Sequence, residues 1–181
     1  MKRKPAAIRV WLCVVFAALS ADRPLSSQEI LEPPGETEFL TRVIVPGAAG
    51  WVDTGRDVEK DDEIVFSATG RISLQVGNPV AVCGPDGYDI RSVQQPLPDE
   101  NIGALIGKVV QLVGIKKDEE TGEEIREEVV RYFMIGASAR VLMPLAGRLH
   151  LGINENVFED NAGAFTVDLA RSRRDRPETS P

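Results

Sequence analysis

Strand-length stretches of apolar residues recur along the chain, with turn-forming residues between them. Glu63–Thr69 alternates, with Ile64, Phe66 and Ala68 on one face. The other stretches that favour strands are Phe39–Pro46, Trp51–Gly55, Arg71–Val76, Gly103–Val113, Val129–Ile135, Arg148–Ile153 and Ala164–Leu169. Turn signals about every ten residues are typical of sandwiches and jelly rolls. The pattern therefore predicts an all-β, jelly-roll-like β-sandwich covering residues 38–169.

One segment, Ile115–Glu128, departs from this rhythm because ten of its fourteen residues are charged. Glu and Lys are good helix formers, so a helix is an alternative. However, predicted strands flank the segment and Gly122 lies near its centre. We therefore predict a charged hairpin insertion, either simply solvated or serving as an acidic docking arm.

The two ends of the chain lack the strand pattern. Basic residues before Val10, the apolar run Val10–Leu19 and the Ala18-Leu19-Ser20 pattern predict a signal peptide over residues 1–20. The apolar run is shorter than the roughly 20 residues of a membrane span. Residues 21–37 read as a linker, and the charged residues 170–181 as a disordered tail. We expect an exported protein of the periplasm, the cell surface or the medium.

Composition narrows the classes of partner. Removal of the signal's four basic residues lowers the formal net charge of −7 by four, to −11. Such acidity disfavours nucleic acid and anionic membrane surfaces and is compatible with a divalent cation. Without Cys13, the chain keeps one cysteine, Cys83, and one histidine, His150, too few for a Cys/His zinc site. A buried cysteine and a strand histidine are favoured over a nucleophile pair.

The strongest candidate for binding chemistry is the loop Asn154–Asn161. Six of its eight residues carry side-chain oxygens: Asn154, Glu155, Asn156, Glu159, Asp160 and Asn161. Ca²⁺ takes six to eight oxygen ligands and accepts carboxylate, amide and carbonyl together. The spacing is not that of an EF-hand. A tight turn built from Asn and Asp is the alternative, and the residues alone leave both open.

Several motifs resemble those of the LecA-type (PA-IL-like) galactophilic lectin family of bacteria, over about Phe39 to Leu169. The specific motifs are Gly103-Ala-Leu-Ile-Gly-Lys108 and Asp160-Asn161-x-Gly163-x-Phe165. The weaker ones are Trp51-x-Asp53-Thr54-Gly55, Cys83-Gly84-Pro85-x-Gly87, Ala146-Gly147-Arg148-Leu149 and Asn154-Glu155.

The resemblance implies a β-sandwich in which Ca²⁺ orders the loop and coordinates two sugar hydroxyls. By it, the metal ligands are Glu155, Asp160 and Asn161, with a backbone carbonyl from Ser73–Gln75. The sugar-contacting residues are Asn154, Glu155, Asp160, Arg91 and Gln94. Glutamate at 155 and arginine at 91 depart from the family's aspartate and histidine, so the identity of the sugar stays open.

The predicted function is a non-catalytic, calcium-assisted carbohydrate-binding domain, with a glycan or envelope polysaccharide as partner. A structural or adhesive envelope sandwich without sugar binding is the alternative. A glycosidase is disfavoured, because Glu155 and Asp160 share one short loop with no candidate deep cleft and no apolar surroundings. The sequence leaves a homo-oligomer open.

Overall fold

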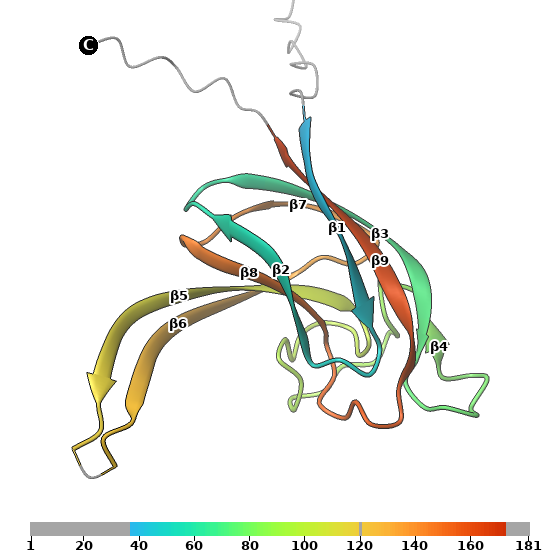
Figure 1. Ribbon diagram of the computed structural model, residues 1–181. Coiled ribbons are helices and arrows are strands. Elements are labelled where there is room, and N and C mark those ends of the chain that lie inside the picture. Colours follow the sequence, from blue (N-terminus) through green and yellow to red (C-terminus); the bar gives the residue numbers. More distant parts are fainter. Residues whose placement is uncertain (1–36, 120, 173–181) are drawn as a thin grey trace, which may run out of the picture. The chain divides into compact units, whose positions relative to one another are not determined.

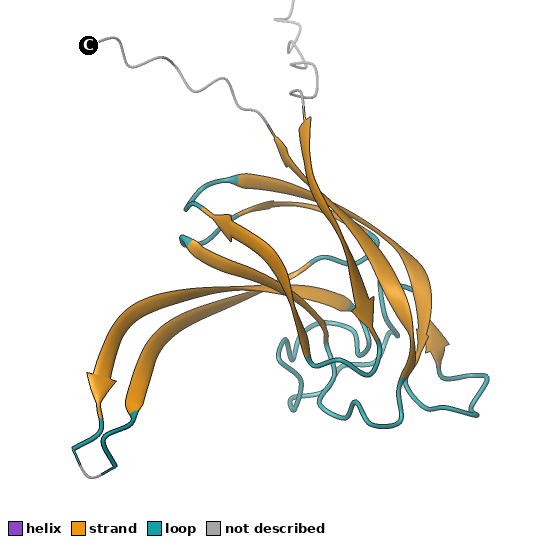
Figure 2. Cartoon of the chain, in the orientation of Figure 1, coloured by secondary structure: helices purple, strands orange, loops and turns teal. Residues whose placement is uncertain are grey.

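Residues 37–119 and 121–172 are described by a computed structural model, and every regular element among them is a β-strand (Figure 2). All of them belong to one compact unit. The predicted signal peptide and nearly all of the predicted linker lie outside the described residues. The strands are β1 Thr37–Pro46, β2 Trp51–Val58, β3 Glu63–Ser73, β4 Val82–Cys83, β5 Leu105–Lys117, β6 Glu124–Met134, β7 Ser138–Leu142, β8 Gly147–Ile153 and β9 Ala162–Ser172.

These strands form two antiparallel sheets (Figure 1). The first has the order β1-β9-β3-β4, and β7 also pairs with β3. The second has the order β2-β8-β5-β6. The prediction of an all-β sandwich is confirmed. Within the described ranges there is no helix long and apolar enough to cross a bilayer.

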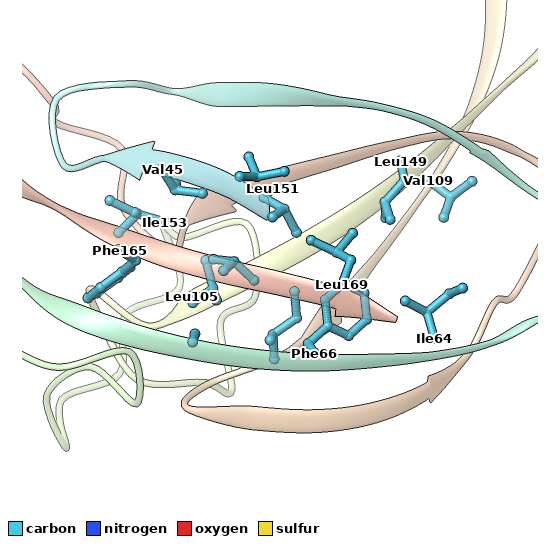
Figure 3. Packing of buried hydrophobic residues seen from close by; sticks show 14 of the residues in the cluster. Val45, Ile64, Phe66, Leu105, Val109, Leu149, Leu151, Ile153, Phe165 and Leu169 are labelled. Atoms are coloured by element: carbon cyan, nitrogen blue, oxygen red, sulfur yellow. The ribbon is translucent and has the colours of Figure 1, made fainter. Parts of the chain in front are cut away.

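One apolar core lies between the two sheets (Figure 3). The first sheet contributes alternate residues of β1, β3 and β9, such as Phe66, Phe165 and Leu169, and the second contributes Leu105, Leu149 and Leu151. Alternation in a strand sends every second side chain to one face, which explains why the pattern at Ile64, Phe66 and Ala68 points inward. Burial of this apolar surface is the main stabilising contribution to the fold.

The charged segment is a hairpin and not a helix. β5 and β6 pair from Ile106 opposite Met134 out to Lys117 opposite Glu124, so most of the charged residues lie in the strands themselves. At the tip, the carboxylate of Asp118 accepts a hydrogen bond from the amide of Thr121 at 2.8 Å. Gly122 adopts a φ of 74°, which a glycine takes without strain. The prediction of a hairpin is confirmed.

The strand boundaries differ from the prediction at several places. Glu63–Thr69 and Arg71–Val76 are not separate strands, because β3 runs through Gly70 to Ser73. The predicted disordered tail starts too early, since residues 170–172 continue β9 and Ser172 pairs with Thr37. Arg171 also forms an ion pair with Asp62 at 3.1 Å. Strands β4 and β7 were not predicted, since β4 has two residues and no residue of β7 is buried.

Leu151 lies on β8 at 0% exposure and tests the core. We expect Leu151→Ala to lower the free energy of unfolding by about 2–5 kcal/mol, because it opens a cavity where neighbours cannot fully collapse. Urea titration measures this. Val93→Ala is the control, because Val93 is 88% exposed. Equal stability of the two variants would contradict the assignment of the core.

Candidate functional site

The loop Asn154–Asn161 joins β8 of one sheet to β9 of the other, so it crosses the end of the sandwich (Figure 1). Backbone hydrogen bonds fix both of its ends. The amide of Asn154 donates to the carbonyl of Ala104 at 2.8 Å, and the amide of Val76 donates to the carbonyl of Asp160 at 2.7 Å. The loop is therefore held between the segments that follow β3 and precede β5.

Gly163 explains the glycine in the Asp160-Asn161-x-Gly163 motif. Its φ is 80°, and a Cβ there would lie 2.4 Å from the carbonyl oxygen of Arg71 on β3. Only glycine fits this backbone conformation and this close approach. The glycine of the motif is thus needed for β9 to start directly after the loop, whatever the loop binds.

The side chain of Asn154, which was predicted to contact a sugar, points into the protein. Its side chain is buried, its Oδ1 accepts from the amide of Leu97 at 3.0 Å, and its Nδ2 donates to the carbonyl of Leu97 at 2.9 Å. The same Nδ2 lies 3.3 and 3.1 Å from the carbonyls of Glu100 and Asn101. Asn154 therefore ties the segment 97–101 to the end of β8. The correction has a physical reason: a buried amide must satisfy its polar atoms within the protein.

Glu155 is half-buried and stabilises the turn that follows it. Its Oε1 accepts hydrogen bonds from the amides of Asn156 at 2.8 Å and Val157 at 3.3 Å. The Nε2 of Gln95 donates to the same oxygen at 3.3 Å. The carboxylate is consequently oriented by its own backbone and by one amide from the 94–97 segment.

Of the two neighbouring glutamines, Gln95 and not the predicted Gln94 reaches the loop with its side chain. The side chain that reaches Glu155 belongs to Gln95, while Gln94 accepts a hydrogen bond from Asn156 Nδ2 through its backbone carbonyl. Arg91 is exposed and lies 4.0 Å from the carboxylate of Asp89. The two neighbouring glutamines look equivalent in the sequence, so only the path of the segment distinguishes them.

Asn161 provides the least satisfied polar atom of the loop. It is 6% exposed, and its Nδ2 donates to the carbonyl of Gly47 at 3.2 Å. Its Oδ1 is buried without a hydrogen-bond partner, as is the Oε1 of Gln95. Buried acceptors without partners are uncommon and call for a specific explanation, such as an ion or a water. Two of them occur at this one end of the sandwich.

Other features limit which cation the loop could hold. The part of the chain that the structure describes contains no group of three or more His, Cys, Asp or Glu side chains able to hold a metal. Glu155 is held beside Gln95, whereas the backbone of Asp160 is held beside Val76. A shell at Asp160 and Asn161 would have to draw on amide and backbone carbonyl oxygens, which suits Ca²⁺ and does not suit zinc.

The end of β3 lies beside this loop, since Ser73 pairs with Ala162. An open depression of about 360 Å³ lies there, and its lining includes Val76, Pro79, Val82 and Ala162. The depression is mostly apolar, so it offers a surface for C–H groups next to the oxygen-rich loop. It was not predicted, because residues 73–82 must fold back on themselves and meet Ala162 to form it.

Cys83 and His150 do not form a catalytic pair, since they lie on β4 and β8 in different sheets. Burial raises the pKa of the Cys83 thiol to about 11. A thiol with so high a pKa is a poor nucleophile at neutral pH. Cys83 is thus a buried cysteine and His150 a residue of a strand, as the sequence predicted.

Comparison with known proteins gives a likeness of fold. No family model and no curated protein matches the sequence. Among solved structures, the chain is similar to one described as "EclA N-terminal domain; PllA-like lectin", with a TM-score of 0.52 and 19% identity. The match covers 75% of this chain and 98% of that chain. The fold is thus a lectin-like β-sandwich, and the narrower LecA-type family stays a prediction.

Asn154 allows a test of how the site is held. We expect Asn154→Ala to destabilise the protein by about 2–4 kcal/mol, because the buried groups of the 97–101 segment lose their partners. Hydrogen exchange at the Leu97 amide should accelerate. Glu159→Ala is the control in the same loop, because Glu159 is exposed. If the two variants were equally stable and equally protected at Leu97, the anchoring role would be wrong.

Proposed function

We propose that this chain is a non-catalytic, calcium-assisted carbohydrate-binding domain of an exported protein. The observation that carries the proposal is Asn161 Oδ1, a buried amide oxygen without a partner beside an exposed carboxylate, Asp160. The lectin-like fold supports the proposal only as a likeness, because one fold serves many functions. The predicted signal peptide supports export.

In this proposal the residues at the end of the loop hold the cation. Asp160 supplies a carboxylate, Asn161 supplies its Oδ1, and backbone carbonyls near the end of β3 supply further oxygens. A bound Ca²⁺ offers open coordination positions that two neighbouring hydroxyls of a sugar can fill. The hydrogen bond to Gly47 keeps the Asn161 amide oriented, so its oxygen is positioned before the ion arrives.

The surroundings of the loop suit the rest of a sugar. Glu155 presents a carboxylate that can accept hydrogen bonds from hydroxyl groups, and the Nε2 of Gln95 orients this carboxylate. The apolar depression lined by Val76 and Pro79 suits the C–H face of a sugar ring. Recognition by a few polar groups beside an apolar surface is the usual design of a small-molecule site.

The competing function, a structural or adhesive envelope sandwich without sugar binding, is favoured by one observation. No cluster of three acidic or metal-binding side chains occurs among residues 37–119 and 121–172. Under this alternative the loop is a turn, and Asn161 Oδ1 stays buried with no ligand. The two functions differ in their response to calcium.

Calcium should stabilise the folded protein by mass action. At a free calcium concentration of 100 times Kd, we expect a gain of about 2.7 kcal/mol, visible as a rise in Tm of several degrees that EDTA reverses. Asp160→Ala should abolish the rise. Glu159→Ala is the matched control, because Glu159 is the neighbouring exposed carboxylate and should keep the rise.

Two results would contradict the metal site. Wild-type protein whose Tm does not respond to calcium would favour the structural alternative. If Asp160→Ala and Glu159→Ala lost the calcium-induced rise in Tm equally, calcium would be screening the acidic surface in general and not binding a specific ligand.

A glycan array in millimolar calcium should identify the sugar. We expect signals from glycans that present neighbouring hydroxyls, lost in EDTA and in Asp160→Ala and retained in Glu159→Ala. Binding that survives EDTA would keep the carbohydrate function and overturn the role of calcium. An array without signals, together with no calcium response, would leave the structural function.

A further inference from the structure

β6 forms the uncovered edge of the second sheet. In the order β2-β8-β5-β6, it is the last strand, and its partner along its whole length is β5. The hairpin extends away from the rest of the sheet (Figure 1). On the side away from β5, alternate residues of β6 therefore present backbone N–H and C=O groups to which a further strand could pair.

Proteins usually protect such an edge, and other edges of this fold are protected. The register of β2 shifts between Asp53 and Asp57, and that of β1 shifts between Phe39 and Thr41, before β1 ends at Pro46. Bulges and prolines hinder pairing with another chain. In the β5–β6 ladder the extra residue is Val113, on β5, so the eleven residues of β6 run without a bulge or a proline.

The residues of β6 are complementary to those of a second, antiparallel copy of β6 centred on Val129. In an antiparallel pair centred there, Glu127 lies opposite Arg131 of a second copy, and Ile125 lies opposite the second copy's Phe133. Each of these contacts occurs twice because of the two-fold axis. Opposite charges and apolar residues placed directly across such a pair are stabilising.

We propose that β6 pairs with β6 of a second copy in this register, joining the two four-stranded sheets into one continuous sheet. The exposed side chains on the strand support it. Ile125 is 49% exposed and Tyr132 is 43% exposed, and the pairing gives each a partner, with Tyr132 opposite Arg126 of the second copy. Tyr132 is already positioned by Trp51, with ring centroids 5.6 Å apart.

The neighbouring registers are less favourable. Two residues directly opposite each other must have their side chains on the same side of the sheet. The register can therefore change only in steps that keep each side chain on its side. One such step places Glu128 opposite Glu128 of the second copy. The opposite step places Glu127 opposite Phe133 and leaves Arg131 opposite Val129. The register centred on Val129 is thus selected by charge.

A charge exchange within β6 tests this proposal. By analytical ultracentrifugation of the full exported chain, we expect a dimer whose Kd rises about tenfold or more in Arg131→Glu, which faces Glu127 with a like charge twice. The double variant Glu127→Arg with Arg131→Glu should restore the dimer to within a few fold of wild type. Glu127 also pairs with Lys116, so thermal melting checks that each variant is folded.

A cysteine at the two-fold axis gives a second measurement. Residues directly opposite in an antiparallel pair have Cα atoms about 4.5–5.5 Å apart, within reach of a disulfide. Mild oxidation should therefore cross-link Val129→Cys into a covalent dimer. Glu128→Cys is the control, because its own copy lies diagonally across the pair, and wild type tests the buried Cys83.

The results separate the possibilities. Three results together would support the pairing. Arg131→Glu loses the dimer, the double variant restores it, and Val129→Cys cross-links whereas Glu128→Cys does not. A wild-type chain that stays monomeric at about 100 μM and does not cross-link at residue 129 would overturn it. A dimer insensitive to both charge variants would place the interface elsewhere and would equally overturn it. None of these readouts depends on calcium or a sugar.

Discussion

The packing of two apolar sheet faces against each other determines where everything else in this domain lies. β8 is an inner strand of one sheet, and β9 is an inner strand of the other. Leu149, Leu151 and Ile153 on β8 and Phe165 and Val167 on β9 are essentially buried in the shared core. The loop Asn154–Asn161 must therefore bridge two layers whose separation the core fixes. A loop with its ends fixed in this way can position polar groups that a free segment of the same composition could not.

Within that loop, some polar residues stabilise the structure and others remain available for binding. Asn154 satisfies its amide with the 97–101 segment, and Glu155 satisfies part of its carboxylate with its own turn. Asn161 keeps an oxygen without a partner. A dense set of polar residues thus does not mean that all of them bind a ligand. A buried polar group that has no hydrogen-bond partner destabilises the fold. Such a group is therefore the best candidate for contact with a ligand.

The fold likeness and the site support different conclusions. At 19% identity, the lectin described above shows the arrangement of the strands. The binding proposal depends on the chemistry of Asp160, Asn161 and Gln95, which belongs to this chain. The long β5–β6 hairpin adds a feature of a different kind, an open strand edge whose charges complement themselves. The loop and the hairpin are attached to the same framework of β5, β8 and β9. Substitutions can nevertheless be made in one without altering the residues of the other.

The sequence predicted the elements whose side chains separate clearly into inner and outer faces. Alternation at Ile64, Phe66 and Ala68 located β3, and the apolar runs located β5 and β8. It did not locate β7, because no residue of that strand is fully buried and its pattern lacks contrast. It also placed the start of the tail too early, because residues 170–172 are held by backbone pairing that no side-chain pattern reports.

For the candidate site, the sequence by itself determined the composition of the loop, the glycine that follows it and the strands at its two ends. Those are local properties, set by residue type and spacing. Only the tertiary structure decided that Asn154 is an anchor, that Gln95 and not Gln94 reaches Glu155, and that the end of β3 lies beside Asn161. These relations join segments tens of residues apart in the chain, and the register of the strands and the packing of the two sheets create them.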